Sequence, residues 1–354
     1  MGTTDRKRIS IGSSEIYCKA SARPEFWMET KKYDKVFLLV DENTNQYCLP
    51  AILKSEREFF DAKIIIPSGE TNKTLETAKE IWQTLLEINA NRKSLLVNLG
   101  GGTITDIGGF AASTFMRGIP FVNIPTTLLA MIDASIGGKT GVDYQGYKNY
   151  LGTFHFPEAV YIIPSLLESL DVRQLKSGFA ELIKHAIVAD AELWQKIEKY
   201  DDVDFKNVEP LIRDAIQIKV DIVNQDFREA GERKKLNFGH TVGHAIESLY
   251  LQSGKNILHG EAVAIGMLVE SSLSVKGKLL SKNDFEKIES IIRRFFPIPS
   301  LNDEEIKKIL HLIHFDKKNH SNKIHFSLPA KIGSCHVDQF FAESEILFAL
   351  KEVL

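Results

Sequence analysis

The sequence has few cysteines, no long hydrophobic run and no excess of charge of one sign. Its three cysteines, Cys18, Cys48 and Cys335, lie far apart and form no CxxC pair. We interpret them as reduced structural thiols rather than a disulfide framework. No apolar run approaches the ~18 residues that span a bilayer, and the first ten residues, MGTTDRKRIS, lack the apolar segment of a secretory signal. We therefore expect a cytoplasmic protein that does not enter a membrane.

The balance of charge argues against two classes of partner. The formal net charge is -3, so no basic excess points to nucleic acid or to an anionic membrane surface as a partner. The chain has 354 residues, of which 44% are hydrophobic. That length and composition predict a globular protein of two domains.

The first half of the chain alternates strand-like and helix-like segments. A helix is expected near residues 75–88, between apolar runs that end in polar or glycine residues. Strands separated by helices predict a parallel sheet, and ligands bind such sheets at the carboxyl ends of the strands. We predict an α/β, Rossmann-like domain over residues 1–171. The expected strands are 35–43, 63–70, 94–102, 121–127 and 159–164.

The second half is dominated by helical patterns, and one late strand is expected at 323–333. We predict a mostly α-helical domain over residues 172–354. Its clearest helices are 178–190, 208–227, 236–250 and 260–278.

The segment VNLGGGTITDIGGFAAST, residues 97–114, reads as a strand, three glycines and a helix. Glycines allow close approach of a phosphate, and a helix N-terminus offers free N–H groups. The pattern is not GxGxxG, so it is also consistent with a plain tight turn. Polar residues at other strand ends, such as Asp41, Asn43, Glu70 and Lys73, favour a nucleotide crevice over a plain turn.

The segment MIDASIGGKTGVDYQGYKN, residues 131–149, is expected to be a glycine-rich loop. It is not the GxxxxGK[ST] loop of an ATPase, because Asp133 stands at the position of the first glycine. It carries Lys139, Lys148 and Asn149, and Arg117 precedes it. These cations suit a small, multiply charged anion, although a solvated loop is the simpler interpretation.

His240 and His244 in LNFGHTVGHAIE stand four residues apart, on one face of the expected helix. A zinc site that does chemistry usually has three protein ligands and one open position. Five side chains are candidates, and spacing does not choose three of them; the alternative is a set of core histidines. The candidates are Glu181, His185, His240, His244 and His259.

Taken together, these segments resemble the 3-dehydroquinate synthases, which are sugar phosphate cyclases. The resemblance runs in order from about residue 37 to the DKK at 316–318. It rests on GGGTITDIGGFAAST, FMRGIPFVNIPTTLLAMIDASIGGKTGVD, SGFAELIKHAIVAD, RKKLNFGHTVGHAIE and LHGEAVAIGM. It departs at His155-Phe156-Pro157, where an aromatic-Gln-Pro is usual, and at Ser169, where Thr is common.

The resemblance implies NAD+, a divalent metal (Zn²⁺ or Co²⁺), a homodimer and a sugar-phosphate acid as substrate. It implies Glu181, His240 and His259 as metal ligands, which leaves His185 and His244 out. The implied NAD+ contacts are Asp41, Asn43, Glu70, Lys73, Gly101, Gly102, Thr103, Asp106, Thr126, Thr127, Asp133, Lys139 and Lys148. The implied substrate contacts are Arg117, Asp133, Lys139, Asn149, Lys184, Lys219, Arg233, Asn237, His244 and Lys317 or Lys318. The catalytic set among these is Lys139, Lys184, Lys219, Arg233, Asn237 and His244.

The implied reaction turns 3-deoxy-D-arabino-heptulosonate 7-phosphate into 3-dehydroquinate and phosphate, a step of the shikimate pathway. Oxidation by NAD+, phosphate elimination, reduction, ring opening and aldol closure follow one another without net redox change. The alternatives are a cyclase acting on sedoheptulose 7-phosphate, an iron-dependent alcohol or glycerol dehydrogenase, and a non-catalytic NAD- or metal-binding regulator. Arg233, Asn237, Lys219 and the DKK segment favour a substrate that carries a carboxylate.

Overall fold

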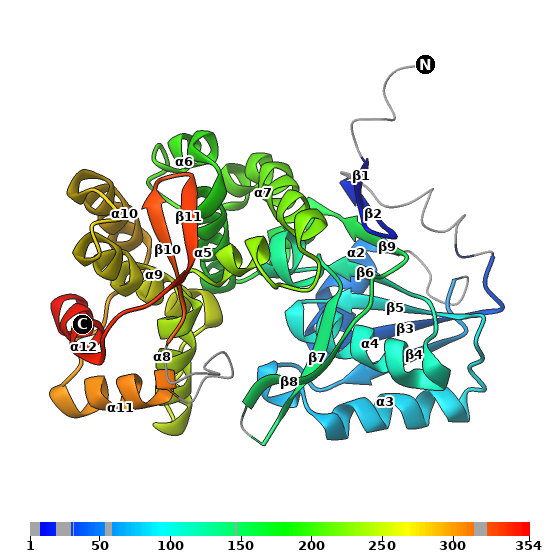
Figure 1. Ribbon diagram of the computed structural model, residues 1–354. Coiled ribbons are helices and arrows are strands. Elements are labelled where there is room, and N and C mark those ends of the chain that lie inside the picture. Colours follow the sequence, from blue (N-terminus) through cyan, green and yellow to red (C-terminus); the bar gives the residue numbers. More distant parts are fainter. Residues whose placement is uncertain (1–7, 19–29, 31, 54–58, 146, 315–323) are drawn as a thin grey trace, which may run out of the picture. The chain divides into compact units, whose positions relative to one another are not determined.

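The computed structural model describes residues 8–18, 30, 32–53, 59–145, 147–314 and 324–354 (Figure 1). The chain divides into two compact units, Met1–Asp171 and Val172–Leu354. Each unit has a core of its own and is described by itself. Within the described residues, no helix is long and apolar enough to cross a membrane.

The first unit is built on a seven-stranded sheet in the order β1-β2-β9-β6-β5-β3-β4. All neighbouring pairs are parallel except β1 and β2, which form an antiparallel hairpin at one edge. The parallel part confirms the predicted α/β fold, whereas the edge hairpin was not expected. The strands are β1 (Arg8–Ile11), β2 (Ser14–Cys18), β3 (Lys35–Asp41), β4 (Ala62–Ile66), β5 (Ser94–Gly100), β6 (Phe121–Pro125) and β9 (Ala159–Ile162).

Central strands of this sheet are buried on both faces, which explains their continuous apolar sequence. Every residue of β5 is buried, and Leu39, Ile81, Ile107 and Phe121 belong to the core between sheet and helices. The main covering helices are α3 (Leu75–Glu87) and α4 (Gly102–Thr114). Short helical segments are η2 (Thr44–Cys48), α2 (Leu49–Ile52), η3 (Glu70–Asn72), η4 (Phe115–Arg117), η5 (Ala130–Ala134) and η6 (Pro164–Ser169).

The segment expected to be a glycine-rich loop is largely ordered as a hairpin, so that prediction was wrong. Strands β7 (Lys139–Tyr144) and β8 (Tyr147–Phe154) pair antiparallel. Gly141 and Gly152 face each other across the pair. A Cβ on Gly152 would lie 2.4 Å from the Thr140 carbonyl oxygen, so these glycines permit the close backbone approach.

The second unit is mostly helical, as predicted, and α9 is its central helix. Helix α9 packs against α5, α8, α10 and α12, and its residues from Ala262 to Ser274 are all buried. A hairpin of two strands covers one side; its second strand, β11, was not expected. The elements are α5 (Val172–Ala189), α6 (Ala191–Ile197), α7 (Phe205–Gln225), η7 (Glu232–Asn237), α8 (His240–Gln252), α9 (His259–Lys276), α10 (Lys282–Phe295), α11 (Asp303–His314), β10 (Phe326–Lys331), β11 (Ser334–Gln339) and α12 (Glu343–Val353).

Glycines set how closely the helices of this unit approach α9. A Cβ on Gly266 would lie 2.0 Å from the Gly239 carbonyl oxygen, which brings α9 against the start of α8. A Cβ on Gly260 would lie 1.9 Å from the Ser177 carbonyl oxygen, which brings α9 against α5. The fully buried Glu270 of α9 accepts N–H bonds from Gly239 (2.7 Å) and Val242 (3.0 Å) and so caps α8.

Candidate active site

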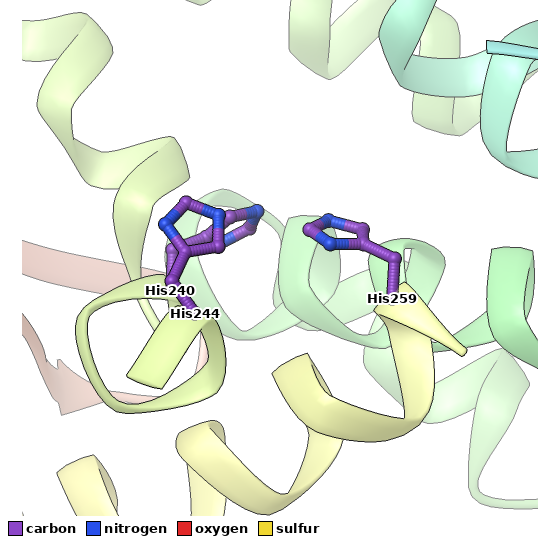
Figure 2. Close-up of side chains that lie close together, drawn as sticks. All are labelled: His240, His244 and His259. Atoms are coloured by element: carbon purple, nitrogen blue, oxygen red, sulfur yellow. The ribbon is translucent and has the colours of Figure 1, made fainter. Parts of the chain in front are cut away.

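Three histidines from two helices gather in the second unit. His240 and His244 lie on α8 and His259 begins α9, and Figure 2 shows the first two rings facing the third. Each ring offers one nitrogen, and these nitrogens lie within 4.8 Å of one another. His185, also a candidate, is fully buried on α5 and is not part of this group.

Glu181 of α5 brings an oxygen to two of these rings. Its Oε1 lies 3.5 Å from His240 Nε2 and 3.6 Å from His259 Nε2. Donors that each sit about 2.0–2.1 Å from a tetrahedral zinc ion are about 3.3–3.4 Å from each other. The two distances from Glu181 Oε1 are therefore compatible with a divalent metal ion shared with His240 and His259.

The other nitrogen of each ring is held by a hydrogen-bonding partner. His240 Nδ1 lies 3.2 Å from the Phe238 carbonyl oxygen, and His259 Nδ1 lies 3.3 Å from Glu247 Oε2. Such partners fix the tautomer and leave Nε2 as the ligand. His244 is the rival to Glu181 as third ligand, since its ring centroid is 5.2 Å from that of His240. The ligand set implied by the sequence stays a prediction.

The electrostatics of the cluster suit a cation. Burial lowers the pKa of His259, but the carboxylates of Glu181 and Glu247 outweigh it and raise the pKa to about 9. Burial, aided by the Lys184 ammonium, holds the pKa of His240 well below its ordinary value. Lys184, which is 1% exposed, forms a buried ion pair with Glu181. Negative charge is thus concentrated on the His259 side of the cluster.

Several predicted substrate contacts also lie in this unit. Lys219 of α7 and Arg233 of η7 are buried, and Arg233 Nη1 donates to the Phe227 carbonyl oxygen at 2.7 Å. Asn237 Nδ2 donates to Glu229 Oε1 at 2.5 Å. Glu229 was not predicted; its positive φ of 62° marks a strained turn that sequence patterns do not show. Lys317 and Lys318 lie outside the described residues.

In the first unit, the predicted nucleotide residues follow three adjacent parallel strands. Asp41 ends β3, Gly100 ends β5, and Thr126 and Thr127 follow β6. The chain leaves β3 for β4 on one side and returns to β5 on the other side. Such a reversal of strand order opens a ligand crevice at the carboxyl ends of the strands. In this sheet the reversal falls between β3 and β5, so the strand order predicts a ligand crevice there.

The glycine turn between β5 and α4 has the features of a phosphate cradle. Gly101 is the N-cap of α4 and no side chain caps the helix start, so its first N–H groups are available to a ligand. A Cβ on Gly101 would lie 3.0 Å from Thr127 Cγ2, so a side chain there would crowd the turn. These residues fit the diphosphate of a dinucleotide. At the end of β3, Asp41 Oδ1 accepts the Thr44 N–H at 2.7 Å.

Lys73 joins several predicted NAD+ residues in one ion cluster. Its Nζ lies 2.8 Å from Glu70 Oε1, 3.3 Å from Asp106 Oδ2 and 3.9 Å from Asp143 Oδ1. Glu70 also accepts a hydrogen bond from Thr103 and lies 3.9 Å from Lys148 Nζ. The structure thus gathers Glu70, Lys73, Thr103, Asp106 and Lys148.

Asp143 is a member of the cluster that the sequence did not single out. It accepts the Asn149 N–H at 2.7 Å and donates its own N–H to the Lys73 carbonyl oxygen at 2.7 Å. Asp143 therefore ties the β7–β8 hairpin, which carries Lys139, Lys148 and Asn149, to Lys73. The remaining predicted residues are Arg117 in η4, Asp133 in η5 and Asn43 after β3.

The cluster predicts a pH dependence of stability for the variant Glu70→Gln. Burial raises the pKa of Glu70, but Lys73 and Lys148 outweigh it and lower the pKa to about 2. A lowered pKa stabilises the fold above the ordinary value of 4.5 and loses that effect as the pH falls towards 2. The variant is expected to be less stable than the parent at pH 7, and the gap should shrink between pH 4.5 and 2. Urea unfolding measures both.

The matched control for this variant is Glu87→Gln. Glu87 is exposed, and its Oε1 accepts a hydrogen bond from the Gln83 amide at 3.0 Å on the same helix. Glu87→Gln is expected to leave the free energy of unfolding at pH 7 nearly unchanged. A gap of constant size for Glu70→Gln would show that the ion cluster does not act through the charge of Glu70.

Comparisons with known proteins show which family the chain belongs to. Family patterns described as 3-dehydroquinate synthase N-terminal and 3-dehydroquinate synthase C-terminal match residues 63–177 and 178–319. The 3-dehydroquinate synthase of Parabacteroides distasonis is 38% identical over 339 residues, which cover 95% of this chain and 96% of that protein. The chain belongs to the 3-dehydroquinate synthase family. This confirms the predicted family and function, and with them an enzyme of the phosphate-eliminating lyase class.

Solved structures of related cyclases share the fold. ValA, a 2-epi-5-epi-valiolone synthase from Streptomyces hygroscopicus subsp. jinggangensis with NAD+ and Zn²⁺ bound, superposes with a TM-score of 0.84 at 28% identity, covering 98% of this chain and 97% of that one. A 2-deoxy-scyllo-inosose synthase complexed with carbaglucose-6-phosphate, NAD+ and Co²⁺ gives 0.85 at 22% identity, covering 98% and 100%. The fold shared with these two cyclases thus extends over both units.

Proposed function

We propose that this protein converts 3-deoxy-D-arabino-heptulosonate 7-phosphate to 3-dehydroquinate and phosphate, with NAD+ in the first unit and a divalent metal ion in the second. The observation that carries the metal assignment is the position of Glu181 Oε1, 3.5 and 3.6 Å from the Nε2 atoms of His240 and His259. The relatives with bound NAD+ and Zn²⁺ or Co²⁺ support the choice of cofactors. When bound, the two groups supply reversible hydride transfer and Lewis-acid polarisation of substrate oxygens.

The chain's own residues then bind and orient the substrate. Lys184, Lys219 and Arg233 are buried cations, and a cation held in a buried site is well suited to a substrate that carries a carboxylate and a phosphate. His244 lies beside the two histidine ligands, where its ring can relay a proton. Asn237 and its partner Glu229 add a donor and an acceptor on the same unit.

NAD+ is held by the crevice between β3 and β5 in this proposal. The α4 N-terminus receives the diphosphate, and Asp41 and Asn43 lie at the end of β3, where a ribose is usually bound. Glu70, Lys73 and Asp106 line the same edge through η3 and α4. The resemblance to the family also leads us to propose a homodimer in the cytoplasm, and light scattering of the purified protein tests the dimer.

The deciding experiment supplies the purified protein with NAD+, Zn²⁺ or Co²⁺, and 3-deoxy-D-arabino-heptulosonate 7-phosphate. Phosphate release and 3-dehydroquinate formation in equal amounts, without net NADH, are expected. Absence of turnover with both cofactors present contradicts the proposal. Faster phosphate release from sedoheptulose 7-phosphate would instead assign another cyclase activity, and net NAD+ reduction by a simple alcohol would assign a dehydrogenase.

A further inference from the structure

We propose that Glu247 is a positioning residue for the metal site: its carboxylate holds the ring of His259 so that Nε2 points at the ion. This inference rests on the proposed metal-binding role of His259. It adds a residue from α8 that touches neither substrate nor metal ion and acts through a ligand.

The contact between Glu247 and His259 joins one carboxylate oxygen to one ring nitrogen. Glu247 Oε2 lies 3.3 Å from His259 Nδ1, and the side chain of Glu247 is 12% exposed. The opposite nitrogen of the same ring, Nε2, lies 3.6 Å from Glu181 Oε1. The ring of His259 is therefore held between two carboxylates, one on each of its nitrogens.

The position of Glu247 along its helix explains why it reaches this ring. His240, His244 and Glu247 stand at positions i, i+4 and i+7 of α8, which share one face of a helix. That face looks toward His259 (Figure 2). The same face of α8 thus carries the proposed ligand His240, the neighbouring ring of His244 and the Glu247 carboxylate, which orients His259 on α9.

The two histidine ligands are held in different ways. His240 Nδ1 faces the Phe238 carbonyl oxygen, two residues away in its own chain segment. His259 has its Nδ1 partner on a different helix, twelve residues earlier in sequence. The orientation of the His259 ring therefore depends on the side chain of Glu247, and a single substitution at Glu247 can remove this contact.

The chemistry of the contact favours metal binding. An imidazole that donates its Nδ1–H to a carboxylate is fixed as the tautomer with a free lone pair on Nε2, and its basicity as a ligand rises. Removing such a partner usually weakens metal affinity by about 10–100-fold. Glu247 is then required for tight metal binding although it does not contact the ion.

The test measures Zn²⁺ affinity of the full-length protein by competition with a chromophoric chelator. Glu247→Ala is expected to weaken binding about 10–100-fold, and Glu247→Gln about 3–10-fold, because the amide oxygen still accepts the Nδ1–H but its lack of charge no longer raises the basicity of the ring. The visible absorption of bound Co²⁺, which reports coordination geometry, is expected to change in Glu247→Ala. Glu289→Gln is the control, because it removes one negative charge from a surface pair with Arg293 on α10.

The outcomes separate this inference from the proposed function. A parent protein that binds no Zn²⁺ overturns the metal site itself. A parent that binds Zn²⁺, together with Glu247→Ala and Glu247→Gln variants that bind within twofold of it, overturns the role of Glu247 alone. If Glu247→Ala does not fold, the isosteric Glu247→Gln decides: weaker binding than Glu289→Gln supports the role, and equal binding overturns it.

Discussion

Replacing Glu181 with glutamine is expected to release the metal ion and to lower turnover by about a thousandfold. The amide is a poor ligand, and Glu181 Oε1 lies 3.5 Å from His240 Nε2 and 3.6 Å from His259 Nε2. Loss of Lewis-acid stabilisation worth about 4 kcal/mol corresponds to about three factors of ten in rate. Metal content after gel filtration and the rate of phosphate release measure the two effects.

His244 provides the comparison that tests the ligand set. His259→Ala is expected to lose both metal and activity, whereas His244→Ala should keep the metal and lose rate. The ring centroids of His244 and His259 are 5.8 Å apart, so both variants disturb the same small region. Equal metal loss in the two variants would show that His244 is a ligand, and full metal retention by Glu181→Gln would show that Glu181 is not.

Gly260→Ala is expected to destabilise the second unit by about 3 kcal/mol and to weaken metal binding with it. The new Cβ would lie 1.9 Å from the Ser177 carbonyl oxygen, a backbone atom that cannot rotate away, and overpacking of this kind costs about 1–3 kcal/mol or more. Relief requires α9 to move from α5, which separates His259 from Glu181. Urea unfolding and Zn²⁺ titration measure the two effects.

Gly254→Ala is the matched control for this variant. No atom lies within 4 Å of its added Cβ, and its φ of +65° is the only source of strain, worth about 1–2 kcal/mol. It is expected to lose some stability and to keep its metal affinity. Normal metal affinity and stability in Gly260→Ala would refute the idea that this contact sets the distance between the ligands.

The sequence predicted the parallel strands and the long helices well, because buried strands and amphipathic helices have distinct periods. It missed β1–β2 and β7–β8 for physical reasons. The strands β1 and β2 are four and five residues long, too short for a clear pattern. In β7 and β8, Gly141 and Gly152 contact backbone rather than a hydrophobic layer, so no apolar alternation marks the pair.

The site was predicted in part. Helical spacing placed His240 and His244 together, but three ligands could not be chosen from five candidates, since Glu181 and His259 meet them only in the folded unit. The family resemblance supplied the choice. Glu247, Glu270 and Asp143 were not predicted, because a single acidic residue on a helix or strand usually faces solvent. Their contacts depend on which elements pack against each other.

The glycine contacts between α8 and α9 have a consequence for how this site tolerates sequence change. The separation of these helices is set where Gly266 meets the Gly239 backbone, and backbone atoms are the same in every protein. Side chains elsewhere in the core can drift among hydrophobic residues of similar size without changing that separation. The geometry of the metal site is thereby insulated from most substitutions around it, and inherited variation that alters it should concentrate at a few glycines.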